Sequence, residues 1–201
     1  DGRVKRIVSN CIDSGYLSDK EYAFAKKHRR RNVFATKRKA GWQRDIVGKV
    51  RRIEAGCNFF IIGVDVAKQR IYSRLDIQKP VDASGKELPK PWAGYMHLNQ
   101  LCTMDYWYEL TAEKITTKRR HGFPMLTWEI IANRENHKLD CEGLNLAAYM
   151  VLNAPIEAMA KQQATMRETR KQLAEKGEPA PPPEPPKQKP LIRKVSRNKG
   201  W

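Results

Sequence analysis

The chain has 201 residues, a formal net charge of +17 and a pI of about 9.9. This length can bury one hydrophobic core and leave residues for a tail. So large a positive excess indicates a polyanionic partner. No apolar run reaches the length of a bilayer span, and the first residues do not form a signal peptide. These features exclude a membrane protein and predict an intracellular location, where nucleic acid is the expected partner.

The four cysteines are scattered through the chain, at positions 11, 57, 102 and 141, without Cys-x-x-Cys spacing. Such a pattern does not match a zinc site or a disulfide framework. We expect reduced cysteines that pack as small side chains in the core.

The first half of the chain predicts an α/β alternation. A β-branched run ends at Asp13, and the Ser-x-x-Glu spacing of Ser18 and Glu21 is typical of a helix-opening capping box. The expected elements are a strand at 4–12, a helix at 18–30, a strand at 32–36, a loop or mobile flap at 37–54, a buried strand at 58–65 and a short helix at 67–75. Strand, helix and strand in this order favour an α/β sheet.

The second half predicts turns, a hairpin and two helices. The expected elements are turns at 79–92, a strand at 94–98, a helix at 105–115, a basic hairpin at 116–131, a helix from near Asp140 to 152, and a second helix that Asn153 caps, to about 176. Seven of the twelve prolines follow within 179–190. The domains are therefore predicted as 1–152, a helical extension at 153–177 and a Pro-rich basic tail at 178–201, either plainly disordered or an extended docking peptide.

Three aspartates could carry chemistry. Asp13 follows a predicted strand, where side chains line the ligand crevice of an α/β sheet, but it could equally cap a turn. Asp140 could be a first-turn helix acid, stabilised by the helix dipole. Together they suggest a carboxylate pair for divalent metal, because phosphodiester hydrolysis needs acids that converge from separate elements. Asp65 ends the most apolar strand, and a helix cap is favoured over an auxiliary metal ligand.

Basic residues form several patches. Residues 26–52 hold twelve Lys or Arg and one acid, Asp45, and they include Trp42, so a DNA clamp is expected there. The candidate DNA-binding residues of the whole chain are Lys37, Arg38, Lys39, Arg44, Arg51, Arg52, Lys68, Arg119, Arg120, Arg134 and Lys138.

Several blocks in colinear order resemble one family, the lambda-type large terminase subunit (GpA) of tailed bacteriophages. Ile-Asp-Ser-Gly-Tyr at 12–16 looks like its second acidic motif. Asn-His-Lys-Leu-Asp-Cys at 136–141 resembles its third, usually Asn-Glu-Ala-Leu-Asp-Cys. Residues 62–68, 94–97 and 110–114 continue the similarity, which covers about residues 5–155.

The resemblance implies an RNase H-like nuclease with three carboxylates that hold Mg²⁺ or Mn²⁺, two ions in all. Asp13 takes the second carboxylate and Asp140 the third. The first has no counterpart here and is expected upstream, so the fold would lack its first strand and the isolated chain would be inactive. No phosphate loop is present, so the packaging ATPase is also expected upstream.

The implied function is cutting of concatemeric double-stranded DNA during viral packaging. The implied partners are the ATPase domain, the portal protein and the small terminase subunit, within an oligomeric motor at the procapsid in the host cytoplasm. A non-catalytic basic DNA-binding or assembly module is the alternative. An RNA-binding protein of ribosomal type fits the charge but not the ordered motifs.

Overall fold

The computed structural model describes residues 7–52, 56–88 and 94–175. The chain divides into two compact units, Asp1–Val151 and Leu152–Trp201. The described part of the first unit holds a four-stranded sheet with helices on both faces, a two-stranded sheet and further helices. The expected α/β class is confirmed.

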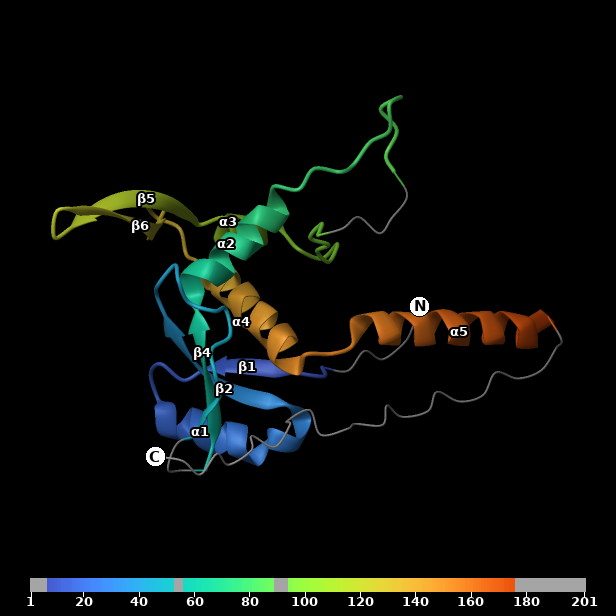
Figure 1. Ribbon diagram of the computed structural model, residues 1–201, viewed down its shortest axis with the longest axis horizontal. Coiled ribbons are helices and arrows are strands. Elements are labelled where there is room, and N and C mark those ends of the chain that lie inside the picture. Colours follow the sequence, from blue (N-terminus) through green and yellow to red (C-terminus); the bar gives the residue numbers. More distant parts are fainter. Residues whose placement is uncertain (1–6, 53–55, 89–93, 176–201) are drawn as a thin grey trace. The chain divides into compact units, whose positions relative to one another are not determined.

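The four-stranded sheet has the order β1-β2-β4-β3 (Figure 1). Three strands run parallel, β1 (Asn10–Asp13), β2 (Val33–Lys39) and β4 (Asn58–Gly63). The short β3 (Arg51–Arg52) pairs antiparallel with β4. Helix α1 (Ser18–Lys27) and the 3₁₀ turn η1 (Arg29–Arg31) connect β1 to β2. A parallel pair needs such a crossover, so the predicted strand–helix–strand order is confirmed.

The register of β1 against β2 decides which side chains share a sheet face. Cys11 pairs with Phe34 and Asp13 with Thr36, so these residues lie on one face with Arg38 two positions further along β2. The opposite face carries Ala35, which packs with Tyr22 and Ala25 of α1. Burial also raises the pKa of the Cys11 thiol to about 12, as expected for an inert core cysteine.

Helix α4 (His137–Leu152) covers the face of Cys11 and Phe34. Its contacts with the sheet come from Leu144, Ala147, Ala148 and Val151. These positions follow Asp140 at four, seven, eight and eleven residues, which is the spacing of one helix face. Asp140 therefore belongs to the stripe of α4 that faces the sheet.

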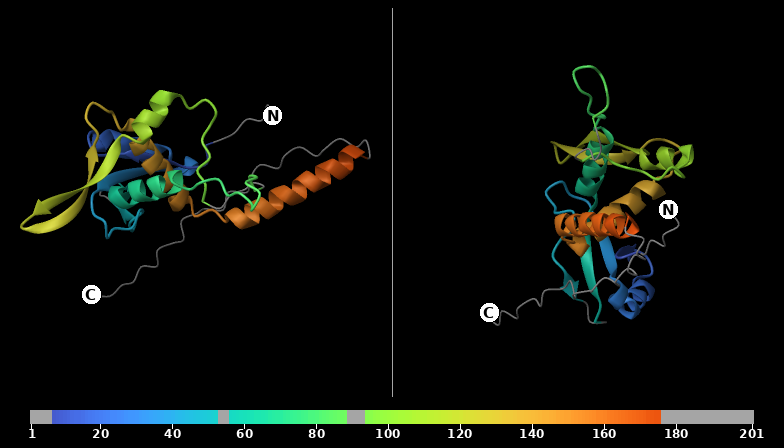
Figure 2. Two further views of the ribbon diagram at one scale, coloured as in Figure 1. Left: turned by 90° about the horizontal axis from the view of Figure 1, so that it is seen from above. Right: turned by 90° about the vertical axis from the view of Figure 1, so that its right-hand side faces the viewer.

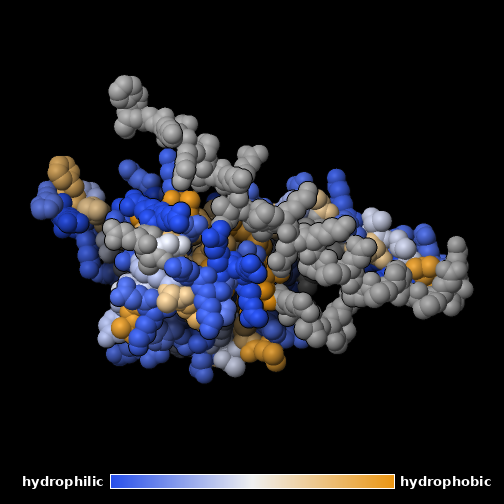
Figure 3. Space-filling view, turned by 90° about the horizontal axis from the view of Figure 1, so that it is seen from below, coloured by the Kyte–Doolittle hydropathy of each residue, from blue (hydrophilic) through white to orange (hydrophobic). Residues whose placement is uncertain are grey.

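Helices α2 (Val64–Leu75) and α3 (Met104–Leu110) form a second core with α4, centred on Ile71, Leu110 and Leu139. Beyond α3, β5 (Glu113–Arg120) and β6 (Phe123–Ile130) form an antiparallel hairpin. Its two-residue turn has positive φ at His121 and Gly122, the geometry that suits twisted strands. The hairpin projects from the first unit (Figure 2). Hydrophilic and hydrophobic residues lie side by side on it (Figure 3).

The second unit contains α5 (Ile156–Glu175). The helix expected after Asn153 is confirmed, but Asn153 itself has a φ of +42° and is left-handed, which is not the extended conformation of an N-cap. Among the described residues, no helix is both long and apolar enough to cross a membrane. The tail expected at 178–201 lies outside the described residues.

Several local predictions were wrong. Ser18 does not form a capping box, because its hydroxyl donates to the Ser14 carbonyl and α1 has no side-chain cap. Residues 94–98 form no strand, and the helix expected to 115 ends at Leu110. The loop or flap expected at 37–54 is partly strand, because its first residues belong to β2 and Arg51 and Arg52 form β3. Cys141 is exposed, although Cys11 and Cys57 are buried as expected.

Gly63, the last residue of β4, touches the loop that precedes β3. Its N–H donates to the Ile46 carbonyl at 3.0 Å, and a Cβ there would lie 2.5 Å from the Asp45 carbonyl oxygen. Gly63→Ala should therefore lower the free energy of unfolding by ~1–3 kcal/mol through overpacking, measured by urea denaturation. Gly143→Ala is the control, because no atom within 4 Å opposes a Cβ there. That change should raise helix stability by up to ~1 kcal/mol, and equal losses in both variants would contradict the steric argument.

Candidate functional site

Asp13 lies at the carboxyl end of β1 and is oriented by its own turn. Its Oδ1 accepts the Gly15 N–H at 3.1 Å. A Cβ at residue 15 would come within 3.3 Å of the same oxygen, so glycine lets the turn close over the carboxylate. Asp13 thus caps a turn, and its second oxygen, Oδ2, faces Arg38 at 2.9 Å from Nε.

Asp140 lies in the first turn of α4. Its N–H donates to the Asn136 carbonyl at 3.0 Å, the first helical bond. Its Oδ2 pairs with Nη1 of Arg38. The first-turn position predicted from the sequence is confirmed, and the side chain faces the sheet.

Arg38 joins the two aspartates. Nε and Nη1 belong to one planar guanidinium, so Asp13 and Asp140 are brought to the same point from a strand and a helix. The three side chains are 30%, 23% and 40% exposed for Asp13, Asp140 and Arg38. Burial acts to lower the pKa of Arg38, but the bonds and charges of Asp140 and Asp13 raise it overall. The guanidinium is thus a firmly held cation at the rim of the fold.

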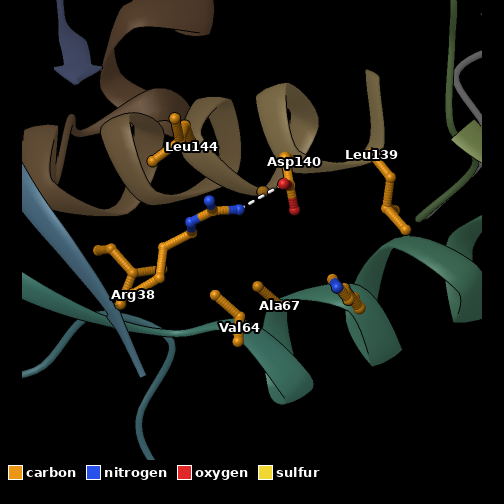
Figure 4. A pocket seen from close by; sticks show the side chains of 9 residues that line it. Arg38, Val64, Ala67, Leu139, Asp140 and Leu144 are labelled. Carbon is orange, nitrogen blue, oxygen red and sulfur yellow. Dashed lines mark hydrogen bonds and ion pairs between the residues drawn. The ribbon is translucent and has the colours of Figure 1, made fainter. Parts of the chain in front are cut away.

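A small pocket opens beside this group (Figure 4). Arg38 and Asp140 form one wall, and Val64 and Ala67 of α2 lie opposite. Gly143 also lines the pocket, one turn beyond Asp140, and adds no side chain to fill it. Asp140 and the Arg38 guanidinium that binds it therefore border an open pocket.

Asp65 has a different partner. It lies in the first turn of α2 and not at the end of β4, which stops at Gly63. Its Oδ2 accepts the Gly41 N–H at 2.6 Å, so it holds the 40–48 loop and does not cap its own helix. Within the described ranges, no group of three or more His, Cys, Asp or Glu side chains is placed to hold a metal ion.

Trp42 packs within the protein. It stacks on Trp128 of β6 with ring centroids 6.0 Å apart, and its Nε1 donates to the Leu126 carbonyl at 2.7 Å. Trp128 Nε1 in turn donates to the Asp65 carbonyl at 3.2 Å. The loop, the hairpin and the start of α2 therefore form one connected structure.

A buried network supports the start of α4. Glu113 accepts hydrogen bonds from Lys68 Nζ at 2.6 and 2.7 Å and from Asn136 Nδ2 at 2.6 Å. Asn136 is also the residue whose carbonyl receives the Asp140 N–H. Sequence reasoning missed Glu113 and Asn136 as a pair, although each lies in a block of the resemblance. No spacing rule connects residues 23 apart in the chain.

The candidate DNA-binding residues separate into two groups. Internal contacts engage Arg38, Lys68, Arg44 (Ala40 carbonyl), Arg134 (Thr111 carbonyl and Tyr108 ring), Lys138 (Glu109) and Lys37 (Tyr22 ring). Exposed positions on β2, β3 and the hairpin are held by Lys39, Arg51, Arg52, Arg119 and Arg120. The second group is the one available to a polyanion.

The pair of carboxylates suits a hard divalent cation. Both groups offer oxygen, which Mg²⁺ and Mn²⁺ prefer, and Mg²⁺ is often bound by one or two carboxylates and water. Two carboxylates this close repel each other unless a cation lies between them, and here a guanidinium does. Asp13 and Asp140 are the residues that could hold such an ion.

Comparison with protein families gives a match over residues 1–163 to one model, described as "Terminase large subunit gpA, endonuclease domain". The comparisons with curated proteins and with solved structures found no similar chain. The matched segment contains β1, the Arg38 bridge and all of α4. The chain belongs to the family of terminase large subunit gpA endonuclease domains.

Proposed function

We propose that this chain is a metal-dependent endonuclease domain that cuts concatemeric double-stranded DNA for a viral packaging terminase. The observation that carries the proposal is the convergence of Asp13 and Asp140, 127 positions apart, on one guanidinium beside an open pocket. Family membership supports the same activity.

We propose an RNase H-like core for the sheet. Its support is the set of three parallel strands with α1 and α4 on opposite faces, an acid at the end of β1 and a second acid on the covering helix. A third carboxylate would come from upstream of this chain. Mg²⁺ or Mn²⁺, two ions when bound, would activate the attacking water and stabilise the leaving oxygen. Asp13 and Asp140 would hold the ions.

DNA would lie against the exposed basic residues. Arg51 and Arg52 on β3, Lys39 on β2, and Arg119 and Arg120 at the hairpin tip supply charges that contact phosphates without reading sequence. Lys68 and Arg134 contribute less, because Glu113 and the Thr111 carbonyl already bind them.

We further propose the setting that the family implies. The nuclease would act with an upstream ATPase domain, the portal protein and the small terminase subunit, in an oligomeric motor at the procapsid in the host cytoplasm. Each of these is a binding partner to be tested with the full-length protein.

The direct test is cleavage of supercoiled plasmid by the full-length protein. Cleavage should require Mg²⁺ or Mn²⁺ and stop on addition of EDTA, because in the proposed mechanism the ions activate the attacking water. DNA binding, measured by fluorescence anisotropy in the same buffers, should persist without metal. Cleavage that resists EDTA would refute the metal mechanism, and binding without any cleavage would favour a non-catalytic basic module.

A further inference from the structure

The cation that lies between the two aspartates is part of the protein. Arg38 uses Nε for Asp13 Oδ2 and Nη1 for Asp140 Oδ2, so one side chain occupies the point where the two carboxylates meet. The remaining Asp13 oxygen already accepts the Gly15 N–H. Arg38 therefore binds Oδ2 of each aspartate, in the space between the two carboxylates.

Among the described residues that line the pocket, Arg38 is the cation that binds this pair. Lys68 also lines the pocket, but its ammonium donates to both oxygens of the Glu113 carboxylate, which is 3% exposed. Lys68 and Glu113 therefore neutralise each other, and Arg38 supplies the positive charge for Asp13 and Asp140. The balance at this point is two negative charges against one positive.

We propose that Arg38 and a divalent cation compete for the same position between Asp13 and Asp140. This inference rests on the proposed function, since it concerns the metal site of that function. A guanidinium at hydrogen-bond distance from both oxygens would strongly repel a divalent ion placed between them. Metal binding therefore requires Arg38 to leave its position between the two carboxylates.

The position of Arg38 allows this exchange. It lies near the end of β2, its side chain is 40% exposed, and the ion pairs that the structure gives its guanidinium are those with Asp13 and Asp140. Asp13 and Asp140 are fixed by the Gly15 turn and by the first turn of α4. The two aspartates keep these other bonds when Arg38 leaves, so the competition between Arg38 and the cation sets the metal affinity.

The test compares Mn²⁺ affinity by isothermal titration calorimetry, without DNA and at constant ionic strength. Arg38→Gln should bind Mn²⁺ about tenfold or more tightly than wild type, because a site that is mostly occupied by a competitor shows a proportionally weaker apparent affinity. Lys39→Gln, the exposed neighbour on β2, removes the same charge without touching the aspartates. Its affinity should stay within about threefold, from long-range charge alone.

Arg38→Lys provides a second variant if Arg38→Gln fails to fold by circular dichroism. Lysine keeps the charge but lacks the fork that spans two carboxylates, so its Mn²⁺ affinity should fall between those of wild type and Arg38→Gln. A direct readout is the ¹H–¹⁵N signal of Arg38 Nε, identified by its loss in Arg38→Lys. Added Mg²⁺ should shift that signal in wild type and leave it unchanged in Asp140→Asn.

The outcomes distinguish the proposed competition from the proposed metal site. Tighter binding in Arg38→Gln than in Lys39→Gln supports competition. If wild type binds Mn²⁺, Asp140→Asn does not, and Arg38→Gln is no tighter than wild type, the competition is refuted and the metal site stands. If no variant binds metal, both the competition and the proposed metal site are overturned.

Discussion

Asp140→Asn should abolish plasmid cleavage by the full-length protein while its affinity for DNA stays the same or rises slightly. The amide keeps the size of the side chain and its place on the sheet-facing stripe of α4, but it removes one of the two negative charges that meet at Arg38. Loss of a residue that only orients a metal ligand costs about 10–100-fold. Loss of a ligand itself should cost more than that, seen as plasmid that stays supercoiled.

The matched control is Asp105→Asn. Asp105 also lies in the first turn of a helix, α3, and is exposed, so this change has the same effect on net charge and a similar effect on the helix dipole. Cleavage by this control should equal wild type. Normal cleavage by Asp140→Asn would remove Asp140 from the site, and parallel loss of DNA binding would assign it a binding role instead.

Glu113→Gln should be among the most destabilising single changes in the chain. The Glu113 and Lys68 side chains are 3% and 13% exposed, and the carboxylate holds both Lys68 and Asn136. Glutamine would leave a nearly buried ammonium without its counter-charge, which typically costs ~3–5 kcal/mol. Urea denaturation should show a lower midpoint with an unchanged slope.

Glu129→Gln is the control on the other strand of the same hairpin. Its partner Lys118 is 59% exposed, so solvent replaces the lost ion pair and the effect should be far smaller. A double change, Glu113→Gln with Lys68→Met, should recover part of the lost stability, since no charge is then stranded. Similar losses for Glu113→Gln and Glu129→Gln would show that the buried network does not stabilise the fold.

The sequence predicted the parallel core well because the relevant signals are local. The residues of β1, α1 and β2 alternate in the pattern of a strand–helix–strand unit, and β4 is the most apolar run of the chain. Asp13 and Asp140 were predicted from the motifs that contain them. The sequence suggested that these two carboxylates converge. Their contact through Arg38 could not be derived from it, because that contact depends on how α4 packs against the sheet.

Other features could not be read from the sequence because they are set by distant contacts. Arg38 was predicted to bind DNA, because a run of basic residues does not indicate which of them lies beside the two aspartates. Its role follows from the register that places it two residues beyond Thr36 on the face of Asp13. Residues 94–98 have a strand composition but form no strand, and Met96 and Leu98 pack into the second core. Tertiary packing overrode local propensity there.

The shared face of Asp13, Arg38 and Asp140 limits where this chain can change its length. One residue added within 10–13 or between 36 and 38 would turn the following side chain to the opposite side of the sheet. One residue added between 141 and 144 would rotate Asp140 by about 100° relative to the stripe that packs on the sheet. Additions within 82–85, an exposed turn, would leave these relationships intact. Insertions in related genes are therefore expected to accumulate in such turns and to be rare inside β1, the end of β2 and the start of α4.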